Sequence, residues 1–110
     1  WLFFAAGPLE SAVIDRAINV AVSKDQQRKV GYGKYELTLD VMASAVSKGP
    51  YIAGDRFSAA DVYVGSHLIW GLQFGSIARC DEFEKYVAGL VTRPAYLAAR
   101  AIDVPVGKPV

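Results

Sequence analysis

The chain has 110 residues, of which 53% are hydrophobic and 21% are charged, and 12 Lys and Arg almost balance 11 Asp and Glu. This length fits one domain, and the apolar fraction suffices for a packed core, which excludes a disordered chain. A nucleic-acid-binding surface needs clustered basic charge, and a membrane span needs about 20 consecutive apolar residues. Neither is present, so neither partner is expected. The single cysteine excludes an internal disulfide and fits a reducing, cytoplasmic compartment.

The first expected helix lies within the opening WLFFAAGPLE and its continuation to residue 23. Its apolar residues recur at spacings of four, four and three, which is typical of a helical face. The pair Gly7-Pro8 predicts either a kink or a helix start, because proline donates no backbone hydrogen bond. Four large apolar residues at the start suggest a chain cut inside a longer helix. DQQRKVGYGK, polar and with two glycines, predicts a connecting loop.

Four further helices are expected after this loop, over residues 35–48, about 59–71, about 82–91, and from Pro94 onward. Gly49-Pro50 predicts the stop of the first of these, and proline suits the first turn of the last. The last eight residues, from about 103, hold two prolines and a glycine and predict a tail. No segment alternates with period two for long enough to form a strand. The sequence therefore predicts an all-α domain, a bundle of about five helices.

The stretch GDRFSAAD, residues 54–61, predicts how the third helix begins. Ser58 precedes an apolar run and Asp61 follows three residues later, the spacing of a capping box. Asp61 is also favoured there by the positive end of the helix dipole. Phe57 and Val62 have the spacing of a hydrophobic staple, and Gly54 supplies a turn. Replacing either Ser58 or Asp61 by Ala is expected to cost about 0.5–2 kcal/mol, the usual range for a cap.

A catalytic interpretation of the same stretch is weaker. A serine nucleophile needs a base, and the only histidine, His67, lies more than two helical turns further along the expected helix. Cys80 precedes two carboxylates, Asp81 and Glu82, which should raise the pKa of its thiol and disfavour the reactive thiolate. His67 and Cys80 together fall short of the three or four ligands of a zinc site. No catalytic or metal-binding residue is therefore predicted.

The segment YIAGDRFSAAD resembles the capping box and staple of the C-terminal domain of the glutathione S-transferase family. WLFFAAGPLE similarly resembles the first helix of that domain in bacterial members, and RPAYLAARAID resembles its closing helix. The resemblance covers essentially all 110 residues. It implies an all-helical domain that, in family members, follows an N-terminal thioredoxin-like domain. That first domain binds glutathione and carries the Tyr, Ser or Cys that acts on the thiolate, and this sequence contains no such domain.

The resemblance also implies positions that face the hydrophobic electrophile. Some bacterial relatives have His-Lys where this sequence has Gly7-Pro8, which argues against a catalytic contribution from this helix and for an apolar pocket. Large aromatic side chains at helical spacing are also common in protein cores, and that alternative stays open for the three aromatic residues. The implied substrate-binding positions are Phe3, Phe4, Gly7, Pro8, Ser11 and Trp70.

Two functions follow as expectations. In the first, the chain is the helical half of a glutathione transferase, inactive alone, with glutathione as cosubstrate of the full-length enzyme. It would form a homodimer through its first two helices and expose an apolar surface where the thioredoxin-like domain docks. In the second, the chain is a non-catalytic binding or dimerisation module, since a fold does not by itself imply an activity.

Overall fold

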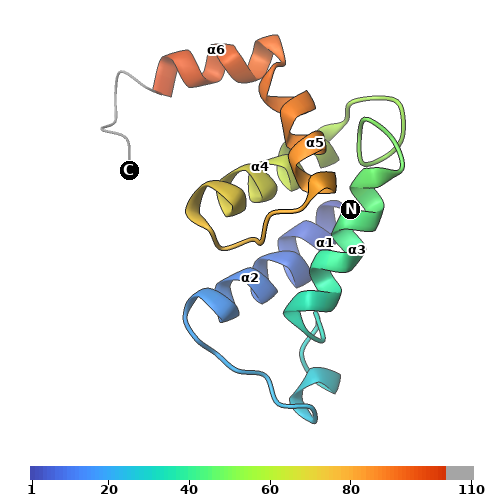
Figure 1. Cartoon of the computed structure of the whole chain (residues 1–110), viewed down its shortest axis with the longest axis vertical. Coiled ribbons are helices and arrows are strands. Elements are labelled where there is room, and N and C mark those ends of the chain that lie inside the picture. Colours follow the sequence, from blue (N-terminus) through green and yellow to red (C-terminus); the bar gives the residue numbers. More distant parts are fainter. Residues whose placement is uncertain (104–110) are drawn as a thin grey trace.

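The computed structural model describes residues 1–103, and the predicted tail lies outside these residues from position 104 onward (Figure 1). The described residues form five helices and no strand; an isolated bridge joins Tyr51 and Gly54. The predicted all-α architecture is therefore confirmed. The first helix consists of α1 (Leu2–Phe4), a π-turn (Ala5–Leu9) and α2 (Glu10–Ala17). It is followed by a short 3₁₀ turn (Gln26–Arg28) and by α3 (Tyr35–Ser47), α4 (Ala59–Phe74), α5 (Asp81–Val91) and α6 (Pro94–Asp103).

The π-turn explains how Pro8 sits inside a continuous helix. The Glu10 N–H reaches the Ala5 carbonyl five residues back. Where hydrogen bonds change from a spacing of four to a spacing of five, one N–H is left without an acceptor. Proline has no N–H, so it occupies that position without losing a bond. The sequence predicted a kink or a helix start here; the helix does not start at Pro8 but continues past it through a widened turn.

The first helix ends at Ala17, so the predicted continuation to residue 23 is wrong. Asn19 has a left-handed backbone with φ of 61°. The Val20 N–H donates to the Asp15 carbonyl at 2.8 Å and the Asn19 N–H to the Arg16 carbonyl at 3.1 Å. These two bonds are those of a Schellman motif, in which asparagine can replace the usual glycine. The apolar spacing suggested helix beyond this point because an Asn stop is a weaker signal than Gly.

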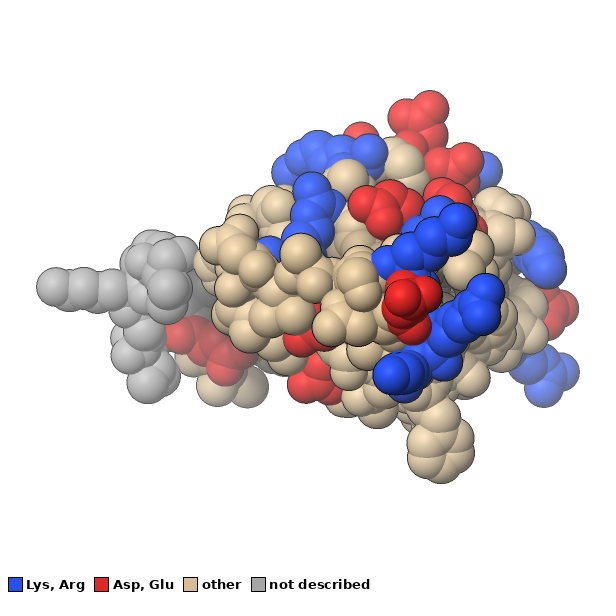
Figure 2. Space-filling view, turned by 90° about the horizontal axis from the view of Figure 1, so that it is seen from below, with Lys and Arg blue, Asp and Glu red and all other residues tan. Residues whose placement is uncertain are grey.

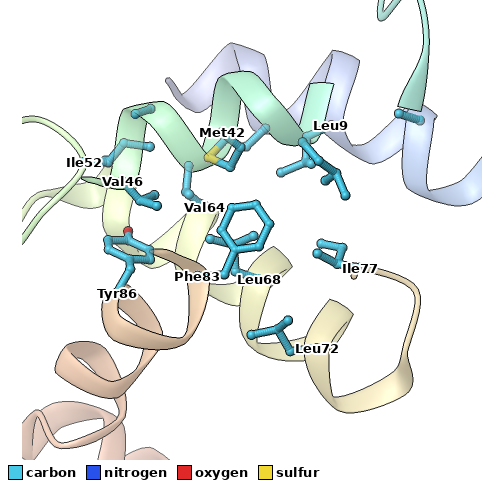
Figure 3. Packing of buried hydrophobic residues seen from close by; sticks show 14 of the residues in the cluster. Leu9, Met42, Val46, Ile52, Val64, Leu68, Leu72, Ile77, Phe83 and Tyr86 are labelled. Atoms are coloured by element: carbon cyan, nitrogen blue, oxygen red, sulfur yellow. The ribbon is translucent and has the colours of Figure 1, made fainter. Parts of the chain in front are cut away.

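The core lies where α3, α4 and α5 meet the first helix. Met42, Val64 and Leu68 have no exposed surface, and Phe83 is 1% exposed. Figure 3 shows these four side chains gathered between the three helices. Leu9 supplies the contribution of the first helix and is also fully buried. Burial of such side chains is the main favourable term in folding.

The apolar side chains of α3 have two kinds of surroundings. Leu39, Met42, Ala45 and Val46 face the core and are buried. Leu37 and Val41 are 51% and 39% exposed. α3 therefore presents apolar surface both inward and outward.

α6 differs from the other long helices because none of its residues is buried. Figure 1 shows it projecting from the bundle, to which α5 joins it. No helix among residues 1–103 is both long enough and apolar enough to cross a membrane. On the face shown in Figure 2, acidic and basic side chains are interspersed.

Candidate functional site

Ser58 and Asp61 form the N-terminal cap of α4. Ser58 is the N-cap residue in an extended conformation, and its backbone N–H donates to Asp61 Oδ2 at 3.0 Å. The reciprocal contact, from the Asp61 backbone N–H to the Ser58 side-chain oxygen, is also present. The well-aligned bond of the Asp61 N–H, however, goes to the Ser58 carbonyl oxygen at 3.0 Å. The carboxylate is therefore the stronger half of this capping box.

The Asp61 carboxylate does more than cap its own helix. It is 1% exposed, and its Oδ1 accepts hydrogen bonds from the Ile52 N–H and the Tyr86 hydroxyl, each at 2.8 Å. One side chain thus ties together the loop before α4, the start of α4, and α5. Burial raises the pKa of Tyr86, and its hydrogen bond to the Asp61 charge raises it further. The sequence did not predict the roles of Ile52 and Tyr86, because neither spacing nor motif links them to Asp61.

The remaining residues of the predicted cap lie around the same turn. Gly54 has φ of +131°, a conformation that disfavours any residue with a Cβ, and it exchanges two backbone hydrogen bonds of 3.1 Å with Tyr51. The Phe57 ring lies edge-on to Tyr51 and beneath the Arg93 guanidinium, 3.4 Å from the ring centroid. Val62 is 57% exposed. Phe57 and Val62, the predicted staple pair, line the same groove between α4 and α6.

The two phenylalanines of the first helix have different environments. Phe3 is 92% exposed. Phe4 is half-buried, packs against the core, and meets Trp1 edge-on with the ring centroids 5.5 Å apart. Phe3 is therefore free to contact another molecule, whereas Phe4 contributes to the fold.

Gly7, Pro8 and Ser11 follow on the same helix. Gly7 and Pro8 are half-buried within the π-turn, and a Cβ added to Gly7 would meet no atom within 4 Å. Ser11 is exposed. Gly7 therefore borders open space.

Trp70 lies at the surface, which decides against the core alternative for this residue. It is 56% exposed and stacks on Phe74, with ring centroids 5.2 Å apart. It borders a hollow of about 290 Å³ between α2 and α4, together with Val13, Tyr63 and His67. It also borders the groove between α4 and α6. The residues lining these two sites include none of the five implied positions of the first helix, so the structure does not bring the six together in one hollow.

His67 and Cys80 have local structural surroundings. The His67 ring meets Tyr63 edge-on at 5.1 Å between centroids. Cys80 is half-buried at the N-cap of α5, and burial raises the pKa of its thiol. A raised pKa disfavours the thiolate that a nucleophilic cysteine needs. Among residues 1–103, no group of His, Cys, Asp and Glu side chains is placed to hold a metal ion.

Comparisons with protein-family models, with curated proteins and with solved structures find no match to this chain. The geometry described above and the resemblance of its sequence motifs are therefore the basis for the function proposed next.

Proposed function

We propose that this chain is the helical C-terminal domain of a glutathione S-transferase, supplying one wall of the hydrophobic electrophile site and the dimer interface. The observation that carries the proposal is the segment YIAGDRFSAAD, residues 51–61. This segment carries the resemblance to the family, and its residues also make hydrogen bonds that hold the fold together. Its Asp61 joins the loop before α4 to α4 and to α5 through three hydrogen bonds of 2.8–3.0 Å.

The electrophile wall would be centred on Trp70. Its exposed indole, stacked with Phe74, gives a flat apolar surface beside the hollow between α2 and α4. Exposed aromatic rings of this kind suit a planar hydrophobic substrate. Phe3 and the open space at Gly7 would extend the wall along the first helix.

Glutathione would be bound by the thioredoxin-like domain, which would also supply the group that acts on the thiolate. The Cys80 thiol of this chain is unsuited to that role because burial raises its pKa. The chain alone is accordingly expected to be inactive.

A homodimer would form through the first helix and α3. Trp1 borders the same shallow surface as Val41, so the two helices present exposed apolar side chains next to each other. Trp1 and Val41 are 46% and 39% exposed, and Leu37, also on α3, is 51% exposed. An exposed apolar patch is typical of an interface. A Val41→Glu substitution should shift the chain towards monomer in analytical ultracentrifugation, and an unchanged sedimentation profile would contradict this interface.

The second candidate is a non-catalytic binding or dimerisation module. The same exposed patch favours it, because such a surface binds a partner without any thiol chemistry. The two candidates differ in whether a glutathione-binding, thioredoxin-like domain precedes this chain in the full-length protein.

The experiment that separates them has two parts. The isolated chain is expected to show no conjugation of 1-chloro-2,4-dinitrobenzene and no retention on immobilised glutathione. Turnover by the chain alone would contradict the assignment of glutathione binding and thiolate activation to the thioredoxin-like domain. The reading frame upstream of the Trp1 codon is expected to encode a strand-helix-strand domain with a Tyr, Ser or Cys near its first turn. A full-length protein without that domain would overturn the transferase proposal and favour the module.

A further inference from the structure

The connection between α2 and α3, residues 18–34, borders a cavity that the proposed function does not use. Figure 1 shows this connection descending from α2 to the lowest part of the molecule and returning to α3. Connections longer than about 12–15 residues are uncommon in compact domains and often carry a binding function. The cavity has a volume of about 430 Å³, within the range of about 300–1,000 Å³ that small-molecule sites occupy. It is therefore large enough for a small ligand.

Hydrogen bonds and packing hold the walls of this cavity in place. The Tyr32 hydroxyl donates to Asp15 Oδ2 at 2.8 Å, which ties the end of the connection back to α2. The Thr38 hydroxyl lies 3.2 Å from the Tyr32 carbonyl oxygen and 3.0 Å from that of Lys34. Val22 packs against the core from the middle of the connection. A cavity with walls fixed in this way needs little reordering when a ligand binds.

Arg16, on α2, lines the cavity and is held over an aromatic ring. Its guanidinium lies 4.1 Å from the centroid of the Tyr35 ring. The Tyr35 hydroxyl is itself fixed by a 2.9 Å hydrogen bond to the Ser76 carbonyl oxygen. Stacking on the ring uses the face of the guanidinium, so the N–H donors at its edge can still pair with a carboxylate.

Two more charged groups line the cavity. Lys34 is the N-cap residue of α3, Glu36 lies in the first turn of that helix, and both are exposed. Among residues 1–103 the ion pair in the structure joins Arg79 to Glu84. The charged groups of the cavity are therefore not neutralised by side chains of this part of the chain. The cavity thus presents two cations and one carboxylate.

The uncharged lining is partly apolar and partly amide. Ala12, Val20 and Val22 offer apolar surface beside the charged groups. Asn19 and Gln27 add amide groups, which can donate to a carboxylate or accept from an ammonium. A ligand that matches this surface is small, carries a short aliphatic part, and has two anionic groups and one cationic group.

We propose that this cavity is a binding site for a dicarboxylic amino acid such as glutamate. The two carboxylates of the ligand pair with Arg16 and Lys34, its ammonium pairs with Glu36, and its methylene groups lie against the apolar lining. Because the three paired side chains are exposed, each contact contributes modestly, and we expect a dissociation constant of about 1 mM. This inference is independent of the proposed function, since it involves neither glutathione nor a second domain.

The test titrates three ligands that differ in one charged group into the isotope-labelled chain. L-Glutamate has all three charges, L-glutamine replaces the side-chain carboxylate by an amide, and glutarate lacks the ammonium. Chemical-shift changes of the backbone amides in residues 16–36 are followed by heteronuclear NMR. Glutamate should bind about fivefold more tightly than either analogue, the effect of one exposed charged contact, and its binding should weaken as salt screens the charges.

Glu36→Gln is the decisive variant because it should change the order of the ligands. It should weaken glutamate binding about fivefold and should not weaken the binding of glutarate, which has no ammonium. Arg16→Gln should weaken the binding of both. Arg28→Gln is the matched control, because it removes an exposed arginine of the same connection that does not line the cavity, and it should change neither.

Three outcomes would overturn the proposal. The first is the absence of a saturable shift change with glutamate, and the second is equal binding of the three ligands. The third is a Glu36→Gln variant that keeps the parent chain's preference for glutamate over glutarate.

Discussion

Replacing Asp61 with Ala should destabilise the domain far more than the loss of an ordinary helix cap. The substitution leaves the Ile52 N–H and the Tyr86 hydroxyl without their acceptor in buried surroundings. Each buried unsatisfied donor costs about 1–3 kcal/mol, and the lost cap adds about 1 kcal/mol. We therefore expect a decrease of about 3–7 kcal/mol in the free energy of unfolding. This is a large part of the ~5–15 kcal/mol that usually stabilises a domain.

Two further variants separate the network from the cap. Ser58→Ala keeps the backbone N–H that donates to Asp61, so it should cost only about 0.5–1 kcal/mol. Tyr86→Phe removes one buried donor together with its bond and should cost about 1–2 kcal/mol. The free energies are measured by urea titration followed by far-ultraviolet circular dichroism, with linear extrapolation to water. An Asp61→Ala variant that loses no more stability than Ser58→Ala would refute the claim that Asp61 joins three elements.

Three other predictions concern pH and backbone space. The folded-state pKa of Tyr86 lies above the usual value near 10, so its contribution to stability is fully present below about pH 10 and is lost as the pH rises beyond it. In urea titrations from pH 8 to 11, the free energy of unfolding should therefore fall less steeply with pH for Tyr86→Phe than for the parent chain. Equal slopes for the two proteins would contradict this prediction. Gly54→Ala should cost about 1–3 kcal/mol, because a φ of +131° strains a residue with a Cβ. A thermal midpoint equal to that of the parent would contradict a requirement for glycine in this turn. Gly71→Ala should cost about 1–3 kcal/mol because the added Cβ would overlap the Ile77 side chain, including the Ile77 Cβ at 2.9 Å. A urea midpoint equal to that of the parent would show that the loop carrying Ile77 can move aside without cost.

The starts of α4 and α6 were predictable because the residues that mark them are specific for helix N-termini. Pro94 opens α6, and Ser58 with Asp61 opens α4. The end of α4 was predicted near Gly71, but the helix continues to Phe74 and stops at Gly75, whose φ is +75°. Gly71 is glycine because Ile77 packs against it. A glycine required by tertiary packing cannot be told from a stop signal in the sequence alone.

The candidate site was predictable only where its parts are close in the sequence. The cap of α4 spans four residues, and its chemistry follows from their spacing. The bonds from Ile52 and Tyr86 to Asp61 depend on how α5 packs against α4, and no local pattern encodes that arrangement. The groove between α4 and α6 likewise depends on the direction in which α6 leaves α5, which no local pattern encodes.

The most direct test of the proposed function is a chimera that joins the thioredoxin-like domain of a bacterial glutathione transferase to residues 1–110. The quantity measured is the glutathione-dependent conjugation of 1-chloro-2,4-dinitrobenzene, compared with that of the thioredoxin-like domain alone. We expect the chimera to conjugate this substrate faster than the isolated domain, and Trp70→Ala to reduce that gain. A folded chimera that is no more active than the isolated domain would contradict the proposal that this chain forms a wall of the electrophile site.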